Sequence, residues 1–137
     1  MTEGIRYAFR VAFHEVDRAG VLFFAHLFRH AHDAYEAWLA SRGVTLGELA
    51  EGRPCRLPLV HAEADYLAPL RHGEEIGVTL AVEVVGDSSF TLACELRGPD
   101  GGLRARVRTV HVAVDPTTER PMSLPVSLRE VLASPGD

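Results

Sequence analysis

Residues 21–42 read VLFFAHLFRHAHDAYEAWLASR and predict the long helix on which the fold is built. Apolar side chains recur in this segment at steps of three and four residues, the spacing that places side chains on one face of a helix. This apolar set is Leu27, Ala31, Ala34, Tyr35 and Trp38. The other side carries Arg29, Asp33 and Glu36. Gly43 follows directly and is typical of the residue that stops a helix.

Strand patterns flank this helix in the sequence. Residues 5–13 alternate apolar with polar or small side chains, which predicts a strand with one buried face. Its apolar set is Ile5, Tyr7, Phe9, Val11 and Phe13. After a short helical or irregular connection over residues 44–56, four further segments alternate in the same way, namely residues 60–66, 76–84, 90–96 and 103–114. A short helix is expected over residues 124–132.

We expect the apolar sides of these strands to face the core. In residues 60–66 the apolar set is Val60, Ala62, Ala64 and Tyr66, and a solvated face holds His61, Glu63 and Asp65. In residues 76–84 the apolar set runs from Ile76 to Val84. In residues 103–114, Arg104, Arg106 and Arg108 share one face with Val110, Val112 and Val114. That face is therefore expected to change from solvent-exposed to buried along the strand.

The order of the elements indicates the fold class. Consecutive strands joined by hairpin-type turns favour an antiparallel sheet packed on one helix, which is an α+β fold. A chain of this length is expected to form a single domain over residues 1–137. One sheet around one helix leaves sheet edges and a sheet face uncovered, so we expect pairing with a second copy of the chain.

The composition narrows the possible chemistry. All 14 residues in the Lys+Arg total are arginine, and the sequence also contains no Asn and no Gln. The absence of lysine excludes Schiff-base chemistry and the lysine of a phosphate-binding loop. Any catalysis must therefore use Asp, Glu, His, Ser, Thr, Cys, Tyr, Arg or backbone groups.

Charge and hydropathy indicate the surroundings of the protein. The net charge of −5 argues against a nucleic-acid partner bound through a broad basic surface. No apolar run approaches the roughly 20 residues that cross a bilayer, and the first residues lack a signal-peptide pattern, so no membrane partner and a cytoplasmic location are expected. Cys55 and Cys94 are the two cysteines, and the sequence leaves their redox state open.

The strongest candidate for a catalytic group lies in HEVDRAGVLFF, residues 14–24. Asp17 precedes the helix by a few residues, and the first N–H groups of a helix are unpaired and lie at the positive end of its dipole. Such N–H groups stabilise a developing oxyanion. Gly20 would allow the sharp turn between the carboxylate and the helix start. The alternative is that Asp17 is a turn residue or a helix cap, and the local sequence alone favours that alternative.

The pattern VDRAGVLFFAHLF at residues 16–28, followed by HDAYEAWL at residues 32–39, resembles the 4-hydroxybenzoyl-CoA thioesterase family of hotdog folds. The resemblance continues in order through EADYLAPLR (63–71), GDSSF (86–90), RTVHVAVD (108–115) and RPMSLP (120–125). It covers nearly the whole chain. The FAH and HDAYEA segments look most like the branch that hydrolyses 1,4-dihydroxy-2-naphthoyl-CoA.

This resemblance implies an antiparallel sheet wrapped around one long helix, in an acyl-CoA thioesterase that is a dimer or tetramer with its active site at a subunit interface. The catalytic aspartate of the family falls on Asp17, as nucleophile or general base, and Gly20 lies in the same loop. The backbone amide that polarises the thioester carbonyl falls near Phe24. The candidate substrate-binding residues are Val21, Phe23, His26, Arg71, Ser88 and Ser89. No cofactor is implied, because coenzyme A is part of the substrate.

The sequence departs from the family pattern at two positions. Many members carry a histidine where this chain has Phe24, so only the backbone amide of that residue would serve. His26 replaces the asparagine common in the naphthoyl branch, and a contact with the acyl group and a half-buried helix histidine are equally expected for it. His26 and His30 have the spacing of zinc ligands, but the glutamate of H-E-x-x-H and a third ligand are missing, so no metal is expected.

Several other residues have two interpretations. Arg71, Arg104, Arg106 and Arg108 would grip CoA phosphates by bidentate contacts, or would be solvated charges on strand faces. Ser88 and Ser89 lie in a turn where relatives bind the CoA arm, although serines are common in turns. Cys94 is expected in the core, and Cys55 lacks the partners of a cysteine hydrolase.

The expected reaction is hydrolysis of an aromatic or medium-chain acyl-CoA to the free acid and CoA. The aromatic preference rests on Phe23, Phe24 and Phe28 and on the branch resemblance. One alternative is a hotdog dehydratase for 3-hydroxyacyl thioesters, whose H-x-F-P-G-type segment is not found here. The other is a non-catalytic acyl-CoA-binding module, which would lack Asp17 or carry an additional DNA-binding segment.

Overall fold

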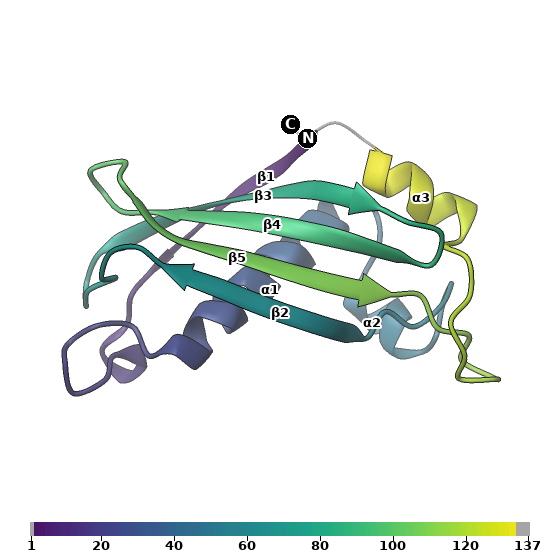
Figure 1. The fold of residues 1–137 in the computed structure, drawn as a ribbon, viewed down its shortest axis with the longest axis horizontal. Coiled ribbons are helices and arrows are strands. Elements are labelled where there is room, and N and C mark those ends of the chain that lie inside the picture. The colour runs from purple at the N-terminus through teal and green to yellow at the C-terminus, as the bar shows by residue number, and fades with distance from the viewer. Residues whose placement is uncertain (1, 134–137) are drawn as a thin grey trace.

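The computed structural model describes residues 2–133, with side chains from residue 6 onward (Figure 1). Its strands are β1 (Thr2–Arg10), β2 (Leu59–Tyr66), β3 (Glu75–Val85), β4 (Ser89–Arg97) and β5 (Leu103–Val112). Its helices are α1 (Phe24–Ser41), α2 (Leu46–Ala50) and α3 (Val126–Ala133), with a 3-10 turn η1 at Phe13–Glu15. The strands form a sheet of order β1-β3-β4-β5-β2 in which all neighbours are antiparallel. The predicted α+β fold is confirmed.

The core lies between one face of this sheet and α1, which crosses behind the strands in Figure 1. The predicted apolar face of α1 is buried, with Leu27, Ala34 and Trp38 fully enclosed. From the sheet, alternate side chains meet this face, namely Ile76, Val78, Leu80, Phe90, Leu92, Leu96 and Val107. Each such large apolar side chain contributes about 1.5–3 kcal/mol to folding. The apolar face predicted for the helix and the apolar faces predicted for the central strands therefore pack against each other.

The segment before α1 differs from its prediction in two ways. β1 ends at Arg10, and Phe13 lies in η1 with 77% of its surface exposed, so the prediction that Phe13 is buried was wrong. The Ile5 side chain lies outside the described residues. α1 begins at Phe24 and not at residue 21, because Val21 forms an isolated β-bridge with Arg71 and cannot be helical. Long-range pairing here overrides the local pattern.

A β-bulge explains one burial error in β3. The register with β4 shifts between Val82 and Val84, so one extra residue enters β3 at Glu83. The bulge reverses the alternation after Val82, and Val84 is 54% exposed where burial was predicted. In β5 the buried residues are Ala105, Val107 and His111. Val110 and Val112 are only half-buried, so the strand face that they share with Arg106 and Arg108 does not become fully buried as predicted.

β2 is one of the two edge strands of the sheet, since it pairs with β5 on one side only, and β1 is the other (Figure 1). Its predicted apolar face is not buried. Val60 is 58% exposed and Tyr66 48% exposed, and only Ala64 is half-buried. The prediction of burial was therefore wrong for the single chain. An edge strand that is exposed on both faces presents unpaired backbone groups and apolar side chains together.

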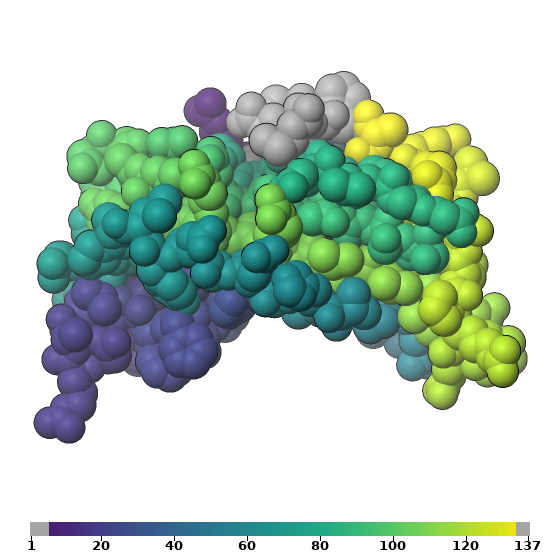
Figure 2. Space-filling view, in the orientation of Figure 1, coloured from purple at the N-terminus to yellow at the C-terminus, as the bar shows by residue number. Residues whose placement is uncertain are grey.

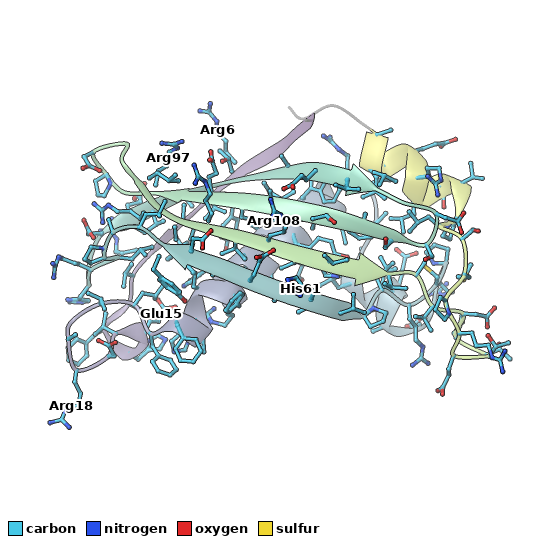
Figure 3. The ribbon with its side chains drawn as sticks, in the orientation of Figure 1. Arg6, Glu15, Arg18, His61, Arg97 and Arg108 are labelled. Atoms are coloured by element: carbon cyan, nitrogen blue, oxygen red, sulfur yellow. The ribbon has the colours of Figure 1, made fainter. Side chains whose placement is uncertain are left out.

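The sheet face turned away from α1 carries a network of charged side chains, from which Arg97, Arg108 and His61 extend in Figure 3. Arg108 contacts Glu83 at 2.8 Å and Glu63 at 3.4 Å. Arg106 and Arg97 both contact Glu95, at 3.6 Å and 3.3 Å. These side chains surround a shallow hollow of about 510 Å³ on the face seen in Figure 2. Arg106 and Arg108 therefore both have carboxylate partners on this exposed face, which agrees with their interpretation as solvated charges on a strand face.

His111 is a buried titratable group in the core, only 3% exposed and stacked on Tyr35 and Phe90 with ring centroids 4.6 Å and 5.3 Å apart. Burial lowers the pKa of His111 from 6.5 to about 4. The unfolded chain therefore binds this proton more tightly than the folded chain, and stability is lost as the pH falls from 6.5 through 4.

We expect His111 to reduce the free energy of unfolding by about 3 kcal/mol between pH 7 and pH 4. Urea denaturation at both pH values measures this loss, and the His111→Phe variant should lose about 3 kcal/mol less over the same interval. An unchanged pH dependence in the variant would contradict the assignment.

No helix among residues 2–133 is long and apolar enough to cross a membrane.

Candidate functional site

The segment between η1 and α1 forms a tight hairpin over residues 16–22. Val16 and Leu22 form an antiparallel bridge, and the N–H of Asp17 donates to the carbonyl oxygen of Val21 at 2.9 Å. The N–H of Gly20 donates to the carbonyl oxygen of Asp17 at 3.0 Å. Gly20 has φ +80°, in the left-handed region that favours glycine, so the predicted need for glycine in this turn is confirmed.

The Asp17 carboxylate is exposed at the start of this hairpin. Its Oδ1 accepts hydrogen bonds from the N–H groups of Ala19 at 2.8 Å and Val21 at 3.5 Å. Asp17 is thus a turn residue, as one interpretation had it, but it does not cap α1, whose N-cap is Phe23. Among the described residues no hydrogen bond reaches Oδ2. One carboxylate oxygen is fixed by the turn and the other is available to a ligand.

The start of α1 lacks a side-chain cap. The N-cap Phe23 has an extended backbone and makes no side-chain cap hydrogen bond. The N–H of His26 donates to the carbonyl oxygen of Phe23 at 2.9 Å, whereas the N–H of Phe24 has no backbone acceptor within residues 2–133. An unpaired N–H at a helix start has the position and polarity of an oxyanion donor.

Tyr66, at the end of β2, is a candidate site residue that the sequence pattern did not reveal. Its hydroxyl donates to the carbonyl oxygen of Phe24 at 3.1 Å, which joins the edge strand to the helix start. Burial raises the pKa of the Tyr66 hydroxyl, so this group is a neutral donor at neutral pH. The only signal in the sequence was its place in an apolar alternation, which pointed to the core.

Arg71, a predicted substrate-binding residue, lies beside the hairpin. It forms the bridge with Val21, and its N–H donates to Glu74 Oε1 at 2.7 Å. Arg104 has a different role, because its guanidinium contacts both Glu74 oxygens, at 2.9 Å and 3.0 Å, and donates to the carbonyl oxygen of Pro69 at 2.6 Å. Arg104 thus fixes the loop that carries Arg71 and is not free for phosphate.

Aromatic side chains lie next to the hairpin. Phe23 and Phe24 are 43% and 58% exposed, and their ring centroids lie 4.7 Å apart. His26 is half-buried and meets Phe23 edge-on at 6.1 Å, so both interpretations of His26 remain compatible with its position. Phe28 is half-buried against the core. The exposed pair forms an apolar surface at the start of α1, directly after the hairpin that carries Asp17.

Ser88 and Ser89 lie at the opposite end of the sheet within one chain. Ser89 pairs with Val112, whereas Tyr66, which contacts the helix start, pairs with Ala105 at the other end of β5. The carbonyl oxygen of Ser88 accepts from the N–H of Ala113 at 2.7 Å. A single chain therefore does not bring these serines to Asp17.

Other candidates for reactive or metal-binding groups do not assemble. His30 Nε2 contacts Glu15 Oε2 at 2.5 Å and is not paired with His26. Across residues 2–133 no group of three His, Cys, Asp or Glu side chains is arranged to hold a metal ion. Cys55 and Cys94 are separate buried thiols, and burial raises the pKa of Cys94 to about 12. A thiol with such a pKa is not a nucleophile at neutral pH.

A long helix wrapped by an antiparallel sheet is the hotdog fold, and the comparisons with known proteins place the chain among the thioester hydrolases of that fold. Residues 11–132 match the model of the thioesterase-like superfamily, and the chain belongs to that family.

Known relatives agree with this assignment. The chain is 35% identical over 130 residues to a 1,4-dihydroxy-2-naphthoyl-CoA hydrolase of Rippkaea orientalis, covering 93% of this chain and 94% of that protein. It is 32% identical to the enzyme of the same name from Microcystis aeruginosa, covering 86% and 85%. A solved 1,4-dihydroxy-2-naphthoyl-CoA thioesterase from Synechocystis superposes with a TM-score of 0.86 at 28% identity, covering 94% and 95%. The resemblance to the naphthoyl branch is confirmed.

Proposed function

We propose that the protein hydrolyses an aryl-CoA thioester of the 1,4-dihydroxy-2-naphthoyl-CoA type to the free acid and CoA. The observation that carries this proposal is the placement of the Asp17 hairpin beside the uncapped start of α1 and the exposed rings of Phe23 and Phe24. The relatives named for this substrate support the acyl group. The reaction needs no cofactor besides the CoA of the substrate.

In the proposed mechanism the thioester carbonyl oxygen accepts a hydrogen bond from the N–H of Phe24. Negative charge grows on that oxygen during attack, and a helix-start N–H stabilises it without reorganisation. Asp17 Oδ2 then acts in one of two ways. As a general base it takes a proton from the attacking water; as a nucleophile it forms a mixed anhydride that water hydrolyses. In both cases the C–S bond breaks, CoA leaves as a thiolate, and solvent supplies its proton.

We propose that a second copy of the chain pairs along the free edge of β2 in a homodimer. The N–H of Leu67 points toward β5, where it donates to the carbonyl oxygen of Arg104, so by alternation the N–H groups of Ala62 and Ala64 point outward. The exposed apolar side chains of the strand flank these groups. A two-fold axis perpendicular to the sheet at this edge would join the two sheets into one and bury both the outward N–H groups and the apolar side chains. Assembly of dimers into a tetramer stays a prediction.

This dimer would also complete the substrate site. A two-fold axis beside β2 sets the Leu59 end of one strand next to the Tyr66 end of the other. Ser88 and Ser89 lie at the Leu59 end, since Leu59 and Phe90 both pair with His111. Those serines of the partner subunit would then lie on the side of Asp17 and hold the CoA arm. Val21, Phe23 and His26 would contact the acyl group, and Arg71 a phosphate.

The substrate class is tested by release of free CoA thiol from a panel of thioesters. We expect kcat/KM for 1,4-dihydroxy-2-naphthoyl-CoA to exceed that for octanoyl-CoA by about 10-fold or more, because an aryl group stacks on exposed rings in a way that an alkyl chain cannot. Benzoyl-CoA serves as the small aromatic control. A higher kcat/KM for octanoyl-CoA would replace the aromatic assignment with the medium-chain one.

Removal of the Tyr66 hydroxyl should weaken the helix start. In Tyr66→Phe the carbonyl oxygen of Phe24 loses a hydrogen bond worth about 1 kcal/mol, so kcat should fall about 5-fold. Steady-state kinetics measures this effect, and Tyr7→Phe on β1 is the control that loses a hydroxyl outside the proposed site. Equal kcat values for the two variants would show that the Tyr66 contact does not support catalysis.

A further inference from the structure

Glu15 is a buried carboxylate that the proposed mechanism does not use. Its side chain is 2% exposed, although it follows directly on the exposed residues Phe13 and His14. Oε1 accepts a hydrogen bond from the N–H of Ala12 at 2.8 Å. Oε2 contacts His30 Nε2 at 2.5 Å and also accepts from the Arg29 guanidinium. A buried carboxylate that accepts this many hydrogen bonds is held in one position.

Glu15 connects to α1 at two separate points. Its side chain reaches Arg29 and His30, more than one helical turn into α1. Its backbone carbonyl oxygen accepts from the N–H of Phe23, the N-cap of the same helix, at 2.9 Å. The hairpin that carries Asp17 begins directly after Glu15 and ends directly before Phe23. One residue therefore closes the base of the hairpin and fixes it against the helix start (Figure 3).

The charge state of this cluster follows from its contacts. His30 is 5% exposed and stacks on Phe9 with ring centroids 3.5 Å apart. Its Nδ1 has no hydrogen-bond partner in the described part of the chain, while its Nε2 faces Glu15 Oε2 at 2.5 Å and the Arg29 guanidinium at 3.3 Å. Because an ionised carboxylate can only accept, we assign the proton of a neutral ring to Nε2, from which it is donated to Glu15. Burial lowers the pKa of His30 and keeps it neutral.

Arg29 is the cation that balances Glu15. Burial alone would raise the pKa of the Glu15 carboxyl, but the N–H of Ala12, the ring of His30 and the guanidinium of Arg29 together lower it. Asp33 also faces the cluster, through its 3.3 Å contact with Arg29. At neutral pH the cluster is thus an ionised Glu15 held between a neutral histidine and a cationic arginine.

We propose that Glu15 is a positioning residue that sets the Asp17 carboxylate relative to the Phe24 N–H. This inference rests on the proposed function. Glu15 does not touch the substrate; it acts through the hairpin, which it ties to α1 at both the N-cap and the following turn. Without the side-chain contacts of Glu15, only backbone contacts such as the Phe23 N–H bond and the bridge of Val21 hold the hairpin against the helix start. The hairpin can then shift, and small errors in such geometry slow a reaction strongly.

Glu15→Gln tests the proposal, because an amide places an N–H donor among the N–H donors of Ala12, His30 and Arg29. We expect kcat to fall about 10- to 100-fold while KM stays within about 2-fold. In an Asp17→Asn background the same substitution should reduce kcat by less than about 2-fold, since the group that it positions is already gone. Asp33→Asn leaves the Glu15 contacts in place and should keep the activity of the wild type.

Two results would overturn the proposal: an unchanged kcat in Glu15→Gln, or the same fold-loss with and without the Asp17 carboxylate. If Glu15→Gln does not fold, Arg29→Gln is measured in the same two backgrounds, since Arg29 is half-exposed and contacts the same carboxylate. Full activity of Asp17→Asn alone would instead refute the proposed mechanism, so the two failures are distinguishable.

Discussion

Asp17→Asn should lower kcat for an aryl-CoA thioester by about 10³-fold or more, whether Asp17 is nucleophile or general base. Asparagine has nearly the same shape, and its Oδ1 still accepts the hydrogen bond that Ala19 donates at 2.8 Å. The hairpin should therefore keep its form. The amide cannot take a proton from water or attack a thioester at neutral pH. KM should change little, because the carboxylate does not carry most of the binding.

Asp100→Asn is the matched control for this variant. Asp100 is also an exposed turn aspartate, and its Oδ1 accepts the N–H of Gly102 two residues on at 3.0 Å. It lies in the turn between β4 and β5, so its amide variant should retain wild-type kcat. Thiol release by both variants, with circular dichroism to verify the fold, makes the comparison. Equal activity of the two variants would mean that Asp17 is only a turn residue.

Ala62→Pro should separate the chain into monomers and abolish turnover. Proline removes the outward-pointing N–H that we assign to the dimer ladder, and its ring obstructs a strand laid against that edge. The ladder between β2 and β5 does not use this N–H. Size-exclusion chromatography with light scattering should show the mass of a single chain, 15.0 kDa. Activity should fall to background, because each site would lose the serines of the partner subunit to which we assign the CoA arm.

Ala62→Val provides the control, since valine keeps the N–H and favours strands. It should remain dimeric and active. A proline variant that remains dimeric would place the subunit contact elsewhere on the molecule. A monomeric proline variant with full activity would show that one chain holds the complete site.

The fold was predictable where local periodicity coincides with burial. The apolar face of α1 and the alternation in β4 led directly to the helix and sheet that pack together. The errors have separate physical causes. Edge and central strands share the same alternation, so nothing local distinguished β2 from its neighbours. The bulge before Val84 and the start of α1 at Phe24 depend on pairing with distant segments.

The arrangement of the candidate site was predictable in part, because several of its residues are neighbours in the sequence. Asp17, Gly20 and Phe24 are close in sequence, and the hairpin joins Arg71 to them through the bridge with Val21. The contact of Tyr66 with the helix start and the burial of Glu15 against α1 depend on tertiary packing. Side chains that meet only in the folded chain leave no spacing to detect. Ser88 and Ser89 were grouped with the site by resemblance, and only a second copy would bring them there.

The most direct test of the central claim is multiple-turnover release of CoA from 1,4-dihydroxy-2-naphthoyl-CoA by the purified wild-type protein. We predict equal amounts of free CoA and free acid, with many turnovers per site. Tight binding of the thioester without any release of CoA would contradict the account, and would make the protein an acyl-CoA-binding module and not a hydrolase.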